Sequence, residues 1–87
     1  MRVTEKRFID FEKVRNYCIA NNLYELGTNE DYNNLLLNLC RRDKEIKTND
    51  LIMIAENILI FSETEMDIKN IIFDLANQCC YTTFIYS

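Results

Sequence analysis

The stretch TNDLIMIAENILIF, residues 48–61, decides the fold of this chain. From Leu51 to Phe61 only Glu56 and Asn57 are polar, so apolar side chains would cover almost the whole circumference of a helix. A helix that is apolar on nearly all sides is buried on most of its surface. We therefore expect a largely buried helix over about 49–61, with the other elements packed around it.

Three helix-start signals place the remaining elements. They are Thr28-x-x-Asp31, Thr48 followed by Asp50, and Ser62-x-x-Glu65, and each puts a hydroxyl and a carboxylate beside free backbone N–H groups. The chain has one glycine and no proline to interrupt helices. We therefore predict an all-α fold, a compact bundle of four helices over about 5–22, 29–42, 49–61 and 63–83, in a single domain spanning residues 1–87.

The last predicted helix has two apolar stripes. One contains Ile68, Ile71, Ile72, Leu75 and Cys79 and faces the third helix, and the other contains Met66, Phe73, Cys80 and Phe84. The second stripe is either covered by the first helix or left as a contact surface. Residues 81–86 are β-branched and aromatic, so this tail is either extended or ordered only against a partner.

The composition argues against catalysis. The chain has no histidine, which removes the usual general base and the commonest metal ligand, and one glycine cannot form a Gly-rich phosphate loop. Its four cysteines, Cys18, Cys40, Cys79 and Cys80, lack CxxC spacing, so buried thiols in a reducing compartment are favoured over a zinc site. We therefore expect no enzymatic activity, no metal and no cofactor.

The lengths of the apolar segments and the distribution of charge limit the expected cellular location and the expected class of partner. No apolar run reaches the roughly 18 residues of a membrane span, and charges throughout residues 1–22 argue against a signal peptide. The net charge is −4, which disfavours direct binding to nucleic acid. We therefore expect a cytoplasmic protein with no membrane contact and with a protein as its partner.

One stretch carries a resemblance at the level of a class. LYELGTNEDY at residues 23–32, followed by Ile54-Ala55 and then Ser62-Glu63-Thr64, resembles small acidic all-helical proteins of bacteriophages and mobile elements, including anti-CRISPR-like inhibitors. The resemblance implies a stoichiometric inhibitor that occludes a surface of a host nucleic-acid-handling defence complex. If the protein is phage-encoded, it acts in the host cell cytoplasm.

These observations lead to one functional hypothesis and two alternatives. We expect a non-enzymatic protein that acts by protein–protein binding, with aromatic anchors and acidic contacts at Met66, Phe73, Phe84, Tyr86, Glu56 and Asp74. The first alternative is a helix-turn-helix DNA-binding regulator using the basic loop from Arg41 to Lys47, although the helix that follows offers acidic side chains to the groove. The second alternative is a homodimeric assembly subunit joined through the same apolar stripe.

Overall fold

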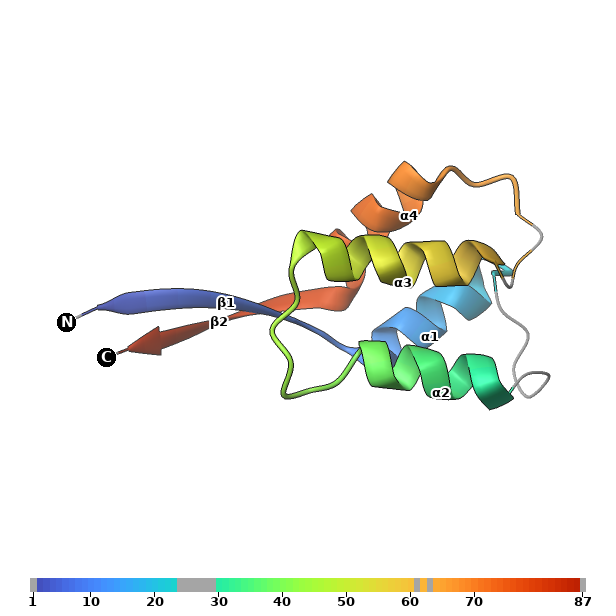
Figure 1. Ribbon diagram of the computed structural model, residues 1–87. Coiled ribbons are helices and arrows are strands. Elements are labelled where there is room, and N and C mark those ends of the chain that lie inside the picture. Colours follow the sequence, from blue (N-terminus) through green and yellow to red (C-terminus); the bar gives the residue numbers. More distant parts are fainter. Residues whose placement is uncertain (1, 24–29, 61, 63, 87) are drawn as a thin grey trace.

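The protein consists of a helical body and a two-stranded ribbon. The computed structural model describes residues 2–23, 30–60, 62 and 64–86, and for residues 31–33 it describes the backbone alone. The described elements, in chain order, are β1 (Val3–Ile9), α1 (Phe11–Ala20), α2 (Glu30–Leu39), α3 (Thr48–Ile60), α4 (Ile68–Asp74), a π-helix η1 (Leu75–Cys79) and β2 (Cys80–Tyr86). Figure 1 shows the helices gathered into one body, from which β1 and β2 project together. The projecting ribbon makes the molecule long, with extents of 48 × 24 × 20 Å.

The all-α prediction is wrong, because the two ends of the chain are strands. β1 and β2 pair antiparallel from Val3 opposite Tyr86 to Ile9 opposite Cys80. Both segments are rich in β-branched and aromatic residues, which favour a pleated conformation. The fold is therefore an α+β arrangement of helices with one two-stranded antiparallel sheet.

The first predicted helix fails over its N-terminal half. α1 begins at Phe11, and the side chain of Asp10 caps it by accepting a 2.9 Å hydrogen bond from the backbone N–H of Glu12. The spacing of Phe8, Phe11 and Val14 resembles a helical stripe, but Phe8 belongs to the strand. Asp10 was the overlooked boundary signal.

The last predicted helix is wrong at both ends. α4 begins after Asp67, whose side chain accepts from the backbone N–H of Lys69 at 3.2 Å. The hydroxyl of Ser62 instead donates to the carbonyl of Ile58 at the end of α3. At the other end the chain passes from η1 directly into β2, so the tail adopts the extended one of its two predicted states.

The third predicted helix is present, but it is buried along one side and not on most of its surface, because Met53 is 48% exposed and Ile60 is 73% exposed. α3 lies in the middle of the body in Figure 1, between α4 on one side and α1 and α2 on the other. Its side chains Leu51, Ile54, Ala55 and Ile58 are buried. They belong to one apolar cluster that also contains Ile9, Val14, Tyr17, Cys18, Leu23, Leu36, Cys40, Ile46, Ile71, Leu75 and Cys79.

The Thr28-x-x-Asp31 start signal cannot be compared with the structure, because residues 24–29 lie outside the described residues. The second signal, Thr48 followed by Asp50, holds in a modified form. The carboxylate of Asp50 accepts from the backbone N–H of Lys47 at 2.9 Å, and Asp50 also forms a 3.1 Å ion pair with Lys44. These contacts at the start of α3 hold the pKa of Asp50 below its usual range.

Candidate functional site

The ribbon is the most distinctive surface of the molecule. Opposite residues of an antiparallel pair share a face, so the register places Phe84 and Tyr86 with Val3 and Glu5 on one face. The other face carries Phe8, Lys6 and Thr4 from β1, with Tyr81, Thr83 and Ile85 from β2. Both faces therefore mix apolar and polar side chains.

The base of the ribbon is fixed to the helical body. Ile9 is fully buried in the core, and the ring of Phe8 stacks on that of Tyr81 with centroids 5.9 Å apart. The backbone N–H of Asp10 donates to the carbonyl of Cys79 at 2.9 Å, and that of Ile46 donates to the carbonyl of Arg7 at 2.7 Å. These contacts attach the ribbon to the helical body at Ile9 and Cys80, and they fix its direction relative to the helices.

The outer part of the ribbon exposes large apolar side chains. On one face near the free end, Phe84 is 55% exposed, Tyr86 66% and Val3 53%, and Ile85 is exposed on the opposite face. An isolated two-stranded ribbon is only marginally stable in water, and a contiguous exposed apolar patch is typical of an interaction site. This arrangement suits a surface that a partner covers.

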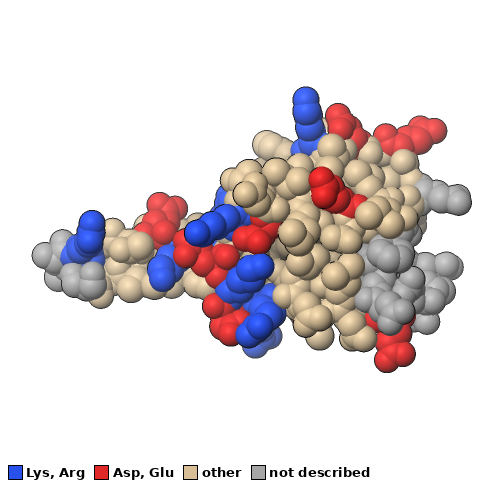
Figure 2. All heavy atoms as spheres, in the orientation of Figure 1, with Lys and Arg blue, Asp and Glu red and all other residues tan. Residues whose placement is uncertain are grey.

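Basic side chains gather on the ribbon and at its base. Residues 2–9 and the loop 41–47 hold seven basic and three acidic side chains, a net charge of +4, whereas the rest of the chain has a net charge of −8. Figure 2 shows these basic groups along the ribbon and where it joins the body, with some acidic groups among them. The hydrogen bond from Ile46 to Arg7 places the loop beside β1. The net charge of the ribbon end is therefore positive, whereas the net charge of the whole chain is negative.

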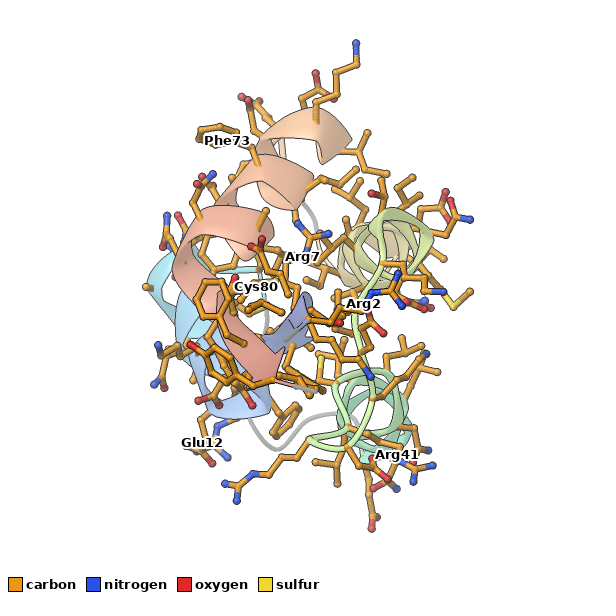
Figure 3. All side chains as sticks on the ribbon, turned by 90° about the vertical axis from the view of Figure 1, so that its left-hand side faces the viewer. Arg2, Arg7, Glu12, Arg41, Phe73 and Cys80 are labelled. Atoms are coloured by element: carbon orange, nitrogen blue, oxygen red, sulfur yellow. The ribbon has the colours of Figure 1, made fainter. Side chains whose placement is uncertain are left out.

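The structure separates the partner-binding residues that the sequence predicted. Phe84 and Tyr86 lie on one face of β2, near the free end of the ribbon. Phe73 is 67% exposed on α4, where it points outward from the body in Figure 3. Met66 precedes α4 and packs half-buried against the core. A single helical stripe containing these residues does not exist, because β2 starts at Cys80.

The two predicted acidic contacts differ from each other. Asp74 is half-buried and accepts a 2.7 Å hydrogen bond from the hydroxyl of Tyr17 through Oδ2, so it serves the packing of α1 on α4. Glu56 is exposed on α3. Burial and the neighbouring Asp74 raise the pKa of Tyr17, so that it stays a donor.

Sequence reasoning missed the residues of β1. Val3, Glu5 and Arg7 share a face with Phe84 and Tyr86, yet the sequence placed them at the start of a helix or before it. The signal that could have found them is the pair of β-rich segments at the two chain ends, VTEKRFI and CYTTFIY.

The described residues offer little for catalysis. An open hollow of about 480 Å³ lies between the start of α1 and the end of α2, and it contains the exposed ion pair of Arg41 with Asp43 at 2.9 Å. This pair lowers the pKa of Asp43, so the carboxylate stays ionised and is a poor proton donor. Burial raises the pKa of Cys18, Cys40 and Cys79 to about 12, which keeps these thiols protonated and weakly nucleophilic. Among the residues with described positions, no group of three or more His, Cys, Asp or Glu could hold a metal ion.

Comparisons with known proteins add no assignment. No protein family, no curated protein and no solved structure matches this chain. In the described ranges, none of the helices combines the length and the apolar character needed to cross a membrane.

Proposed function

We propose that this protein acts without catalysis, by binding another protein with the ribbon formed by β1 and β2. The observation that carries the proposal is the exposure of Phe84, Tyr86 and Val3 on one face of an element that projects from the body. Aromatic side chains are favoured anchors in protein interfaces, because they bury a large area with few rotatable bonds. The basic side chains around the ribbon favour a partner with an acidic rim around an apolar patch.

The resemblance to phage and mobile-element proteins gives the proposal a biological setting. We propose a stoichiometric inhibitor that occludes a surface of a host nucleic-acid-handling complex, in the manner of anti-CRISPR-like proteins. The four cysteines are free thiols, which suits the reducing cytoplasm.

Affinity capture from a bacterial lysate tests the proposal. The wild-type chain should retain a host protein, and Phe84→Ala with Tyr86→Ala should retain about ten-fold less, because both anchors are lost. The matched control is Ile60→Ala, which removes an apolar side chain that is 73% exposed on the body, away from the ribbon. This control should capture as much protein as the wild type.

Two results would contradict the proposal. One is a captured protein that the ribbon variant retains as well as the wild type does. The other is a captured protein that Ile60→Ala loses as completely as the ribbon variant. Capture with Phe73→Ala, which removes the exposed ring on α4, shows whether the contact with the partner extends from the ribbon onto the body.

Nucleic-acid binding is a second candidate, favoured by the net charge of +4 on residues 2–9 and 41–47 beside exposed aromatic rings. A two-stranded ribbon fits the major groove, and aromatic rings can stack on unpaired bases. However, β2 carries no charge and Glu5 lies opposite Phe84. Nuclease treatment of the lysate separates the two candidates: a protein partner survives it, whereas a complex bridged by nucleic acid dissociates.

A further inference from the structure

The two edges of the ribbon differ in their protection. The β1 edge carries Arg2, Glu5, Lys6 and Arg7 along its length, and near the base Ile46 donates a hydrogen bond to it. Charged side chains and a covering loop are the usual means by which proteins prevent an edge strand from pairing with another chain. The sequence of β2, CYTTFIY, has no charge, no proline and no glycine. Its outer edge therefore lacks these protections.

The hydrogen-bond pattern shows which backbone groups point outward from β2. The carbonyl of Arg7 accepts from Ile46, so Arg7 turns its backbone groups away from β2. Residues directly opposite each other in an antiparallel pair share this property, and Arg7 lies opposite Thr82. Thr82, and with it Phe84 and Tyr86, therefore directs its N–H and C=O to the outer edge. No other described backbone group outside the ribbon donates to or accepts from these residues.

We infer that the outer edge of β2 pairs antiparallel with β2 of a second copy of this chain, giving a four-stranded sheet in the order β1-β2-β2-β1. This inference goes beyond the proposed function, because it uses the edge of the ribbon, whereas the proposed partner contacts a face. The two-fold axis passes through the pair formed by Thr83 and Thr83 of the second copy.

The sequence of β2 is complementary to itself in this register. Tyr81 lies opposite Ile85 of the second copy, and Thr82 lies opposite Phe84 of the second copy. Aromatic residues opposite β-branched ones, and threonine opposite threonine, are among the pairs that stabilise sheets. The pairing brings no charges together, because β2 is uncharged.

The direction of the ribbon determines how the two helical bodies of this dimer lie. The ribbon extends along the long axis, with both chain ends at its free end (Figure 1). An antiparallel pair directs the two helical bodies to opposite ends of the new sheet. Thr82 and Phe84 then exchange N–H to C=O hydrogen bonds across the axis, and the faces that carry Phe84 and Tyr86 are doubled.

Sedimentation equilibrium over a range from about 10 μM to about 1 mM tests the inference. The wild-type mass should rise with concentration from 10.4 kDa toward twice that value. Thr83→Glu places two carboxylates opposite each other at the axis, so the dissociation constant should rise about ten-fold or more. The same change sets a carboxylate opposite Lys6 within the monomer, so the ribbon itself should persist.

Thr4→Glu is the matched control, because Thr4 is an exposed threonine on the same face of the other strand. This variant should dimerise like the wild type. A wild-type mass that stays at 10.4 kDa throughout overturns the inference and leaves the edge for a strand of another protein. Equal dimerisation of Thr83→Glu and wild type overturns it too, and neither result affects the capture experiment with Phe84→Ala and Tyr86→Ala.

Cross-linking gives a second readout that does not depend on weakening the dimer. Thr83→Cys brings two thiols together at the axis, so mild oxidation should give a covalent dimer in which disulfide-linked chains predominate. Thr4→Cys and the wild type, with its buried or half-buried cysteines, should stay monomeric under denaturing electrophoresis. Equal cross-linking of Thr83→Cys and Thr4→Cys would rule out the register.

Discussion

At the scale of single residues, the contact between Tyr17 and Asp74 joins α1 to the end of α4. Tyr17 is 5% exposed, and its hydroxyl donates to Asp74 at 2.7 Å. A hydrogen bond to a charged acceptor in a partly buried place contributes more to stability than a neutral one. The acidic group that the sequence assigned to a partner therefore has a role within the fold.

We expect Tyr17→Phe to lower the free energy of unfolding by about 2 kcal/mol, because the half-buried carboxyl of Asp74 loses its hydrogen-bond donor. Urea unfolding monitored by circular dichroism measures the loss. Glu56→Gln, which changes an exposed acid on α3, should stay within about 0.5 kcal/mol of wild type. Equal losses in the two variants would refute a structural role for Asp74.

The buried thiols predict a decline of stability at alkaline pH. Burial raises the pKa of Cys18, Cys40 and Cys79 from 9.0 to about 12. Below pH 9.0 the thiols are protonated in both states, and above it the unfolded chain releases protons that the folded chain retains. Stability should therefore fall between pH 9.0 and about 12, by about 1 kcal/mol per thiol at pH 10. Urea midpoints at pH 8 and pH 10 check this, and Cys18→Ala should show a smaller decline.

At the scale of elements, the ribbon combines a buried base with an exposed end. Ile9 lies in the core, whereas Val3, on the same face of the same strand, is 53% exposed. The strand is therefore held at one end by the hydrophobic core, and its other end is held by backbone pairing with β2. Substitutions at the buried end of β1 should therefore lower the free energy of unfolding more than substitutions at its exposed end.

We expect Ile9→Ala to lower the free energy of unfolding by about 3 kcal/mol, since it leaves a cavity in the core. Val3→Ala should change stability by less than about 0.5 kcal/mol in dilute solution, because its side chain is in water. Thermal unfolding of both variants measures the contrast. A large loss for Val3→Ala would mean that the end of the ribbon is covered within the monomer.

At the scale of the whole molecule, the two chain ends are neighbours. Val3 pairs with Tyr86, so the first and last described segments meet at the free end of the ribbon. The charge is also divided along the molecule, with a net charge of +4 on the ribbon and the loop 41–47 against −8 on the rest of the chain. We therefore expect the ribbon end to attract an acidic partner more strongly than the rest of the molecule does.

Joining β1 to β2 beyond Val3 and Tyr86 through a short Asn-Gly turn should stabilise the fold, because these two residues already lie opposite each other and the unfolded ring has less entropy. The gain should reach up to about 4 kcal/mol for a ring of this size. Urea unfolding of the cyclised chain against the linear chain with the same added residues measures it. A lower midpoint for the cyclised form would contradict the pairing of the two ends.

The sequence by itself determined what depends on local chemistry. The apolar stretch from Leu51 to Ile60 specified a helix that supplies four side chains to the core, although Met53 and Ile60 on the same helix are exposed. The sequence also specified helices that overlap α1 and α2, and the middle of its last predicted helix coincides with α4. The four cysteines are free, as the sequence indicated. Of the predicted contact residues, Phe84 and Tyr86 lie exposed on the ribbon.

Only the tertiary structure decided the ends of the chain. The strand from Val3 to Ile9 pairs with residues about 80 positions away, and helical spacing within a short window cannot reveal a partner so distant. Pairing with β2 supplied backbone hydrogen bonds and the burial of Ile9, which outweighed a helical continuation upstream of Asp10. Beyond the helical body, β1 is the only described element that lies beside β2. Phe84 and Tyr86 are therefore exposed, because no helix covers this part of the strand.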